Sequence, residues 1–194
     1  MTSELNVTDG YLTGHLLLAM PTMSDPRFER TVIYMCAHGP EGAIGLVINR
    51  LIGSLSFPDL LTQLDIEIDP EHHARMPDIH FGGPVETERG FVLHTSDYRH
   101  DGTMWIAGDI ALTANIDILR DIAAGRGPRQ HILTLGYAGW GPGQLEGEIQ
   151  GNAWLCAPCE DTRLFDSDLD EMWNRALAGL GVEAALLSTH AGRA

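Results

Sequence analysis

The sequence predicts a single domain of the α+β class, and three observations lead to that prediction. A length of 194 residues fits one domain. Glycine makes up 22 of the 194 residues, about 11% against a usual value near 7%. This excess indicates many tight turns between short strands. Along the chain, apolar runs typical of strands occur together with segments of helical periodicity.

Apolar runs bounded by turn residues predict the strands. In chain order they span residues 14–20, 31–36, 43–49, 79–81, 90–95, 104–107, 131–137 and 153–156. Pro21 ends the first strand, and the turn at residues 39–42 joins the second and third strands into a hairpin. A second turn, at residues 82–84, separates the fourth strand from the fifth.

Helical periodicity predicts helices at residues 56–64, 109–124, 143–150 and 167–180. Ser56 with Asp59 supplies a capping pattern at the start of the first helix. Gly125 and Gly181 follow the ends of the second and the last helix, where glycine commonly terminates a helix.

The remaining stretches are predicted to lack long regular elements. Residues 1–12 are expected to be the loose N-terminus of a single domain that spans residues 1–194. Pro26, after Ser-Asp, marks a turn or a helix start. Residues 65–78 are acidic and contain proline, so we expect a loop there.

The charged residues exclude several kinds of chemistry. The chain has 27 Asp and Glu against 12 Lys and Arg, a net charge of −15, and all twelve basic residues are arginine. Without lysine, neither a P-loop nor Schiff-base catalysis is possible. A pI near 4.8 argues against binding nucleic acid or anionic lipid by bulk electrostatics. We therefore expect no direct binding of nucleic acid and no membrane association.

The sequence shows no targeting signal. Residues 1–10 contain no positively charged segment. The longest apolar runs, at residues 16–20 and 43–48, are far shorter than the roughly 20 residues of a membrane-spanning helix. Three cysteines are too few for a disulfide framework and suit a reducing compartment. We expect a cytoplasmic protein.

A series of short motifs carries a resemblance to a known family. It consists of residues 14–21, Asp25, Phe28, 32–34, His38, 42–49, 82–85, 89–95, 135–140, 143–146, Glu148, Asn152, Trp154, Leu155, Phe165 and Trp173. In this order the motifs resemble the YqgE/AlgH family of bacterial cytosolic proteins. The resemblance extends over residues 13–192.

The resemblance implies a fold but no chemistry. It implies one compact domain with a curled, mixed, largely antiparallel sheet flanked by helices. The family has no agreed biochemical activity and carries a label of transcriptional regulator, tied to alginate production. It brings no established catalytic residues and no cofactor, so none is carried over to this chain. Residues 66–78 depart from any pattern that we can match.

Cys156 and Cys159 form a Cys-x-x-Cys motif with an intervening proline, which is typical of thioredoxin-like redox sites. Glu160 follows directly, and its charge would raise a thiolate pKa, so we interpret the pair as incidental thiols. Cys36 and His38 would complete a Cys₃His zinc set, although nothing in the sequence brings the two halves together. These four residues are the only metal candidates.

The glycine-rich loop at residues 139–143 lies between a strand and a helix, where phosphates bind to free backbone N–H groups. Glu146 and Glu148 in the following helix would repel an anion, so a tight turn is the simpler interpretation. The alternative is a small-ligand pocket built from Trp140, Asn152 and Asn49.

His38 and His94 are the two histidines of the motifs above that are weighed as site residues. His38 and His94 each lie at the end of a strand, where a hydrogen-bonded structural role is the first interpretation and ligand binding the second. His72 and His73 lie in the predicted loop and are expected to be solvated.

Two hypotheses of function follow. The first is a non-enzymatic protein that acts by binding a protein partner, with an indirect regulatory effect. The second is a binder of small molecules or nucleotides, or an enzyme, that uses the loop at residues 139–143 with His38 or His94. The acidic residues within 160–171 predict a solvated face, with a cation or a basic partner as the alternative.

Overall fold

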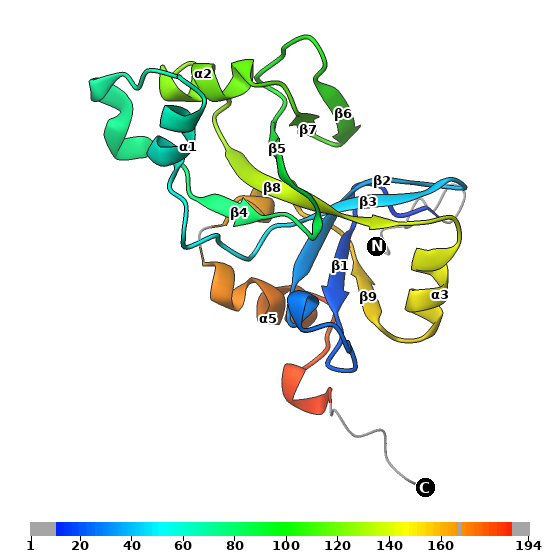
Figure 1. Cartoon of the computed structure of the whole chain (residues 1–194). Helices are drawn as coiled ribbons and strands as arrows, with labels where there is room; N and C mark the ends of the chain where they lie inside the picture. The colour runs from blue at the N-terminus through cyan, green and yellow to red at the C-terminus, as the bar shows by residue number, and fades with distance from the viewer. Residues whose placement is uncertain (1–10, 167, 188–194) are drawn as a thin grey trace, which may run out of the picture.

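A computed structural model describes residues 11–166 and 168–187 (Figure 1). Its elements are β1 (Leu16–Ala19), the 3-10 helix η1 (Pro26–Phe28), β2 (Val32–Gly39), β3 (Gly42–Val47), α1 (Phe57–Gln63), η2 (Pro70–Arg75), β4 (Ile79–Phe81), β5 (Val85–Thr95), β6 (Met104–Ala107), β7 (Ile110–Thr113), α2 (Asp117–Ala123), β8 (His131–Trp140), α3 (Gln144–Gln150), β9 (Trp154–Ala157), α4 (Asp161–Leu164), α5 (Leu169–Gly179) and η3 (Ala184–Leu186). Residues 1–10 of the predicted loose N-terminus, and Ser167 at the start of the last predicted helix, lie outside the described residues.

The described strands form one nine-stranded sheet. Their order is β6-β7-β5-β8-β3-β2-β1-β9, and β4 lies beside β8 off this path. β4 pairs with β8 in parallel, and every other pair is antiparallel. The α+β class and the mixed, largely antiparallel sheet are therefore confirmed.

The sheet is curled, so that its distant strands approach one another. Gly14, just before β1, lies so close to the end of β6 that an added Cβ would be 2.6 Å from the Ala107 side chain. Only a glycine fits this contact, and its φ of 79° is one that other residues rarely adopt. Figure 1 shows the same curl, with β6 and β7 standing over β2 and β3.

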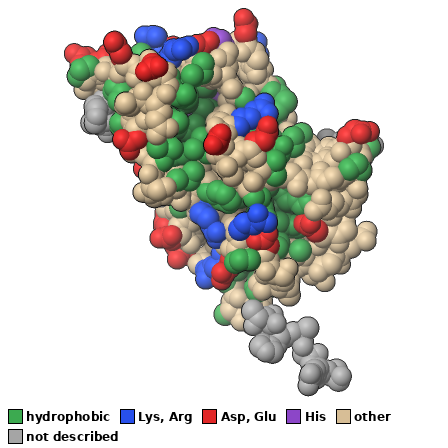
Figure 2. Space-filling view, in the orientation of Figure 1, with side chains coloured by type: hydrophobic (Ala, Val, Ile, Leu, Met, Phe, Trp, Pro, Cys, Tyr) green, Lys and Arg blue, Asp and Glu red, His purple; other side chains and the backbone are tan. Residues whose placement is uncertain are grey.

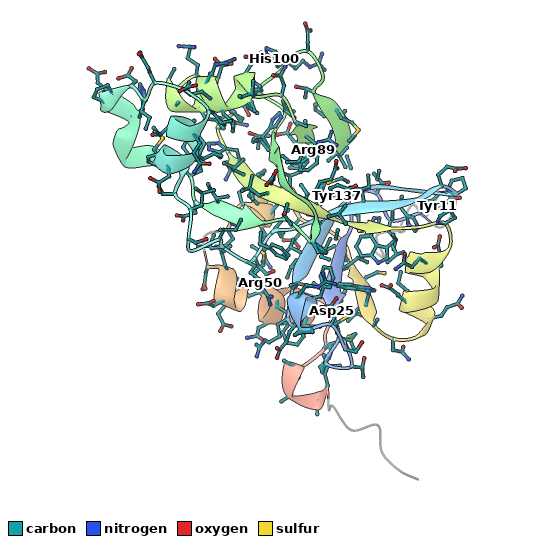
Figure 3. All side chains as sticks on the ribbon, in the orientation of Figure 1. Tyr11, Asp25, Arg50, Arg89, His100 and Tyr137 are labelled. Carbon is teal, nitrogen blue, oxygen red and sulfur yellow. The ribbon has the colours of Figure 1, made fainter. Side chains whose placement is uncertain are left out.

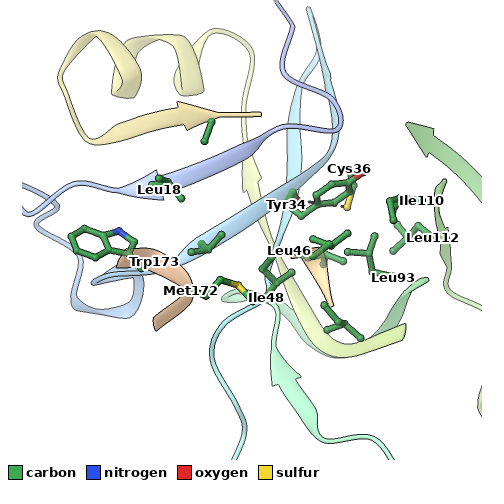
Figure 4. Close-up of a cluster of buried hydrophobic side chains, with 14 of the residues drawn as sticks. Leu18, Tyr34, Cys36, Leu46, Ile48, Leu93, Ile110, Leu112, Met172 and Trp173 are labelled. Carbon is green, nitrogen blue, oxygen red and sulfur yellow. Dashed lines mark hydrogen bonds between the residues drawn. The ribbon is translucent and has the colours of Figure 1, made fainter. Parts of the chain in front are cut away.

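The inner face of the curl holds the largest part of the core. Side chains from β1, β2, β3, β5 and β7 meet there, among them Leu18, Tyr34, Leu46, Leu93 and Ile110 (Figure 4). Helix α5 closes this core with the apolar stripe that its sequence predicts, Met172, Trp173 and Leu177. The Trp173 Nε1 donates to the Ala19 carbonyl oxygen at 3.0 Å, which ties the helix to β1.

Two smaller clusters cover the outer face of the sheet. Around β4, β5 and β8, helices α1 and α2 pack with residues such as Phe57, Ile118 and Leu133. Around β1, β2, β3 and β9, helix α3 packs with residues such as Ile33 and Leu145. The second of these clusters positions the candidate site.

The structure confirms most predicted elements and extends several of them. The hairpin of β2 and β3 forms through the turn after Gly39, and Ser56 with Asp59 caps α1 as a capping box. The last helix ends near Gly181, as predicted. Strand β5 is longer than expected because it continues past a register irregularity between Val85 and Gly90. Strand β8 is longer because its residues 138–140 pair with β3.

Two local predictions are wrong, and one short helix was not predicted. The helix predicted at residues 109–124 is the strand β7 followed by the shorter helix α2. All four residues of β7 are buried, because the strand lies between β5 and β6; its unbroken apolar run therefore fits either element by pattern alone. The predicted loop at 65–78 contains η2, which begins at Pro70 behind the capping residue Asp69. The sequence also gave no sign of the short helix α4.

No helix in the described part of the chain is both long and apolar enough to span a bilayer.

Candidate functional site

Helix α3 covers one end of the sheet, where two of the predicted site residues share a face. In the register of the sheet, His38 pairs with Ala43, and Ala43 pairs with Trp140. Residues paired across strands point to the same side. His38 and Trp140 therefore both face α3, and each binds a different carboxylate of that helix.

His38 connects the start of the described chain to α3. Its Nδ1 accepts a hydrogen bond from the Leu12 backbone N–H at 3.1 Å, so Nε2 carries the proton and donates to Glu146 Oε1 at 3.0 Å. The Glu146 backbone N–H and the His38 ring both lower the pKa of the Glu146 carboxyl. The Tyr11 ring packs edge-on against the imidazole at 5.1 Å. Tyr11 and Leu12, predicted to be loose, are thus in contact with the fold.

Glu148 organises the other side of α3. Its Oε2 accepts hydrogen bonds from the indole Nε1 of Trp140 at 2.9 Å and of Trp154 at 2.8 Å. Its Oε1 accepts from the Gln144 Nε2 at 2.9 Å. One carboxylate therefore joins the end of β8, the helix α3 and the start of β9. The two indole rings meet edge to face, with centroids 5.9 Å apart.

These groups line a cleft of about 370 Å³ that we call the Glu148 cleft. One wall is the segment at residues 22–28, and the other comprises β8, α3 and β9. The lining residues are Thr22, Met23, Ser24, Asp25, Arg27, Phe28, Pro84, Val85, Ala138, Gly139, Trp140, Gln144, Glu148, Ala153 and Trp154. Many of them belong to the motifs that carry the family resemblance.

The wall at residues 22–28 is held in place by its own polar contacts. Asp25 caps η1 and binds the Arg27 guanidinium, with 2.6 Å between Asp25 Oδ2 and Arg27 Nη2. The Arg27 side chain lowers the pKa of Asp25 through these hydrogen bonds. Figure 3 labels Asp25 below β1, and Figure 2 shows arginine and acidic side chains interspersed on the same face. The order of the arginines in the sequence does not predict this arrangement.

Two of the predicted ligand residues, Asn49 and Asn152, are not among the residues that line the cleft and have structural contacts instead. Asn49 Oδ1 accepts from the Val32 backbone N–H at 2.8 Å, and its Nδ2 donates to the Arg30 carbonyl at 3.0 Å. The Asn152 backbone has a φ of 59°, and its carbonyl accepts from Thr22 Oγ1 at 2.9 Å. Asn152 therefore supports the cleft wall without lining it.

His94 lies in the other half of the sheet, on β5. It is 0% exposed, and its ring bonds the Thr95 carbonyl and Thr113 Oγ1, each at 2.8 Å. Burial lowers the pKa of the ring, although the Thr95 carbonyl opposes that effect. With both nitrogens paired inside the protein, His94 matches the structural interpretation of the sequence.

The loop at residues 139–143 is exposed except for Trp140, and one of its backbone N–H groups is hydrogen-bonded within the protein. The Gly141 backbone N–H donates to Gln144 Oε1 at 3.0 Å, and Gly143 takes the left-handed φ of 71° that starts α3. Because α3 is only 7 residues long and carries Glu146 in its first turn, this end of the helix has no feature of a phosphate site.

The cysteines are separated by the sheet. Cys156 packs in the outer cluster with Leu17, whereas Cys36 and Cys159 pack in the inner one. Burial raises the pKa of Cys156, and raises that of Cys36 to about 12. Within the described residues, no three His, Cys, Asp or Glu side chains gather as a metal site would require. Cys36, His38, Cys156 and Cys159 are thus not brought together as ligands.

Of the predicted binding residues, only Trp140 lines the Glu148 cleft. His38 contacts α3 and Asn152 contacts the cleft wall at Thr22. Asn49 and His94 lie elsewhere in the fold. Glu148 and Asp25 are among the residues that carry the family resemblance, but the sequence predicted no site role for either; Glu148 was otherwise interpreted as a charge near a helix start. One signal was available: a buried indole N–H needs an acceptor, and Glu148 lies between Trp140 and Trp154 in the chain.

Fold and site together define a class of protein: a single α+β domain with a curled sheet and an acidic, aromatic cleft at one end. The chain belongs to the family described as AlgH-like (DUF179), whose model matches residues 16–185. This finding confirms the resemblance in the sequence. The family consists of uncharacterised proteins, and no specific biochemical activity comes with it.

Individual relatives cover nearly the whole chain. A UPF0301 protein from Rhodospirillum rubrum is 52% identical over 194 residues, 100% of each chain. Another, from Rhodopseudomonas palustris strain HaA2, is 54% identical over 190 residues, which is 95% of this chain and 87% of the relative.

Two solved structures are similar to this one. The solution structure of the AlgH protein from Pseudomonas aeruginosa has a TM-score of 0.79 and 44% identity, and covers 100% of both chains. The crystal structure of a Corynebacterium diphtheriae protein has a TM-score of 0.71 and 20% identity over 92% of both chains, a likeness of fold alone.

Proposed function

We propose that this protein acts by binding a small organic ligand in the Glu148 cleft. The observation that carries the proposal is the Glu148 carboxylate, whose two oxygens are held by Trp140, Trp154 and Gln144. A polar group that is already fixed loses little conformational entropy when a ligand binds. The volume of about 370 Å³ is within the range of small-molecule sites.

Binding is favoured over catalysis by what lines the cleft. No histidine or cysteine is among its described lining residues, so the side chains that most often transfer protons or attack substrates are missing. Asp25 is paired with Arg27, which keeps its carboxylate ionised and hydrogen-bonded. These features favour reversible binding of a ligand that the protein does not alter chemically.

A regulatory role would then be indirect and cytoplasmic. The three cysteines are free thiols, as expected in a reducing compartment. With a net charge of −15, the phosphate contacts that dominate DNA affinity are weak. In this proposal, ligand binding in the cleft changes how the protein binds a protein partner, and no direct contact with DNA is needed.

A thermal-shift screen tests the proposal. Metabolites and nucleotides are added to the wild-type protein and to two variants, Ser24→Trp and Ser54→Trp. Both serines are exposed; Ser24 lines the Glu148 cleft, whereas Ser54 lines a separate hollow beside α1. Tryptophan at position 24 fills the cleft, and tryptophan at position 54 controls for added surface hydrophobicity.

We expect at least one compound to stabilise the wild-type protein and Ser54→Trp but not Ser24→Trp. At a ligand concentration of 100 times Kd, the gain is about 2.7 kcal/mol, which corresponds to a rise in Tm of roughly 5–10 °C for a chain of this size. Stabilisation that survives in Ser24→Trp would place the ligand elsewhere. A broad screen that stabilises nothing would contradict ligand binding altogether.

A further inference from the structure

The Glu148 cleft contains one carboxylate without a basic partner. Asp25 and Arg27 lie in the same cleft but neutralise each other, with 2.6 Å between their charged atoms. The hydrogen bonds that the Glu148 carboxylate accepts come from neutral donors, two indoles and one amide. Among the described side chains, no arginine or histidine forms an ion pair with it. The cleft therefore carries one uncompensated negative charge.

The carboxylate also keeps room for another donor. An ionised carboxylate offers about four acceptor positions, and Glu148 uses two on Oε2 and one on Oε1. One acceptor position on Oε1 is therefore left over, and Glu148 is one of the residues that line the cleft. An N–H donor of a ligand would complete the set, and a charged donor would form the stronger bond.

Part of the wall around this charge is apolar and aromatic, beside the polar lining residues Thr22, Ser24, Asp25, Arg27 and Gln144. Phe28 packs edge-on against Trp154 at 5.6 Å, and Trp154 packs against Trp140 at 5.9 Å. Val85 and Met23 complete this part of the lining. Such walls match a compact hydrocarbon body, and aromatic rings also attract a cation through their negative faces. The acidic surface of the whole chain raises the local concentration of cations further.

We propose that the ligand of the Glu148 cleft is a compact organic cation: an ammonium or amidinium group that binds Glu148 Oε1, attached to an apolar body between Phe28, Val85 and the two tryptophans. This inference rests on the proposed function and specifies its ligand. An anion of the same shape is excluded by the uncompensated carboxylate, and a neutral analogue lacks the charge-assisted bond.

Four probes that each contain a phenyl ring test the effect of charge. Benzylamine and benzamidine are cations, benzyl alcohol is neutral and benzoate is an anion. Binding is measured by isothermal titration calorimetry to the wild-type protein, Glu148→Gln and Glu146→Gln. The two variants change the net charge equally and lie on the same helix. Only Glu148 lines the cleft, because Glu146 bonds His38 instead.

We expect the wild-type protein to bind benzylamine or benzamidine at least tenfold more tightly than benzyl alcohol, and not to bind benzoate. Glu148→Gln should lose this preference, whereas Glu146→Gln should keep it. The comparison of probes on the wild-type protein stands even if a variant folds poorly. Benzylamine and benzyl alcohol differ only in the group attached to the same benzyl body, so this pair gives the most direct comparison of a charged with a neutral donor.

Three results would overturn the inference. One is equal affinity for benzyl alcohol and benzylamine, and another is unchanged benzylamine binding by Glu148→Gln. The third is no binding of either cation. In each case the Ser24→Trp screen decides separately whether the cleft binds ligands at all, so the proposed function can survive the failure of the cationic ligand.

Discussion

At the scale of single residues, Glu148 connects three elements of the cleft. It accepts the N–H groups of two tryptophans that are only 7% and 3% exposed. A buried donor that loses its acceptor costs on the order of 1–3 kcal/mol. The same side chain thus links the local stability of β8, α3 and β9 to the chemistry of the cleft.

Glu148→Ala should therefore lower the free energy of unfolding by about 2 kcal/mol, because it leaves both indole N–H groups without their acceptor. Glu148→Gln should cost less than about half of that, since the amide oxygen still accepts. Urea denaturation followed by tryptophan fluorescence measures both. Equal stability of the alanine variant and the wild-type protein would show that the indoles do not depend on this carboxylate.

The backbone at Gly42 is a second feature at this scale. This residue begins β3 with a φ of 129°, and an added Cβ would overlap the carbonyl oxygen of Trp140 on the neighbouring strand. Its lack of a side chain lets β8 approach and sets the position of Trp140.

Gly42→Ala should destabilise the protein by about 3 kcal/mol, from backbone strain and the overlap together. Gly147→Ala is the matched control, because Gly147 lies in α3 with nothing within 4 Å of an added Cβ. That control should stabilise the protein by about 0.8 kcal/mol through helix propensity. Chemical denaturation of both variants measures the difference, and a tolerated alanine at position 42 would contradict the close approach of β3 and β8.

At the scale of elements, the sequence predicted correctly those features that depend on residues close together in the chain. The Ser56 capping box, the turn after Gly39 and the apolar stripe of α5 each involve residues near one another in the chain. The strand β7 was mistaken for a helix because its burial comes from β5 and β6, which are brought to it only by the fold.

The candidate site was predicted only in part for the same reason: local signals do not show which distant segments the fold brings together. Trp140 was found because it stands in a glycine-rich turn, which is a local signal. Asp25 and Trp154 lie more than a hundred residues apart in the chain, and only the pairing of β1 with β9 brings their segments together. Asn49 and His94 were polar residues at strand ends whose bonding partners lie within the fold.

At the scale of the whole molecule, buried histidines set how stability depends on pH. Burial lowers the pKa of His80, His94 and His131 from 6.5 in the folded state. The unfolded chain therefore takes up protons first as the pH falls. This stabilisation is fully present above about pH 6.5 and is lost below it. The lowered carboxyl pKa values of Asp25 and Glu146 add a separate loss at more acidic pH.

The urea midpoint should consequently decrease between pH 7.5 and 5.5, before the carboxylates titrate. In His94→Gln, where the side-chain oxygen can still accept from Thr113, the decrease should be shallower because one titrating group is gone. Urea titrations at three pH values measure both slopes. A midpoint that is constant over this range would contradict the burial of neutral histidines.

The central claim concerns one end of the molecule, and its four tryptophans report on it directly. Trp140 and Trp154 donate to Glu148, Trp173 donates to the Ala19 carbonyl, and Trp105 is 49% exposed on β6. Each indole N–H gives its own signal in a ¹H–¹⁵N correlation spectrum, which single Trp→Phe variants assign. Two signals thus report on the cleft and two serve as internal controls.

A titration of the ¹⁵N-labelled protein with benzylamine is the most direct measurement. We predict that the indole signals of Trp140 and Trp154 shift together and saturate, while those of Trp105 and Trp173 stay in place. Movement of Trp105 or Trp173 with the other two signals unmoved would contradict a ligand site at Glu148, as would a spectrum that benzylamine leaves unchanged.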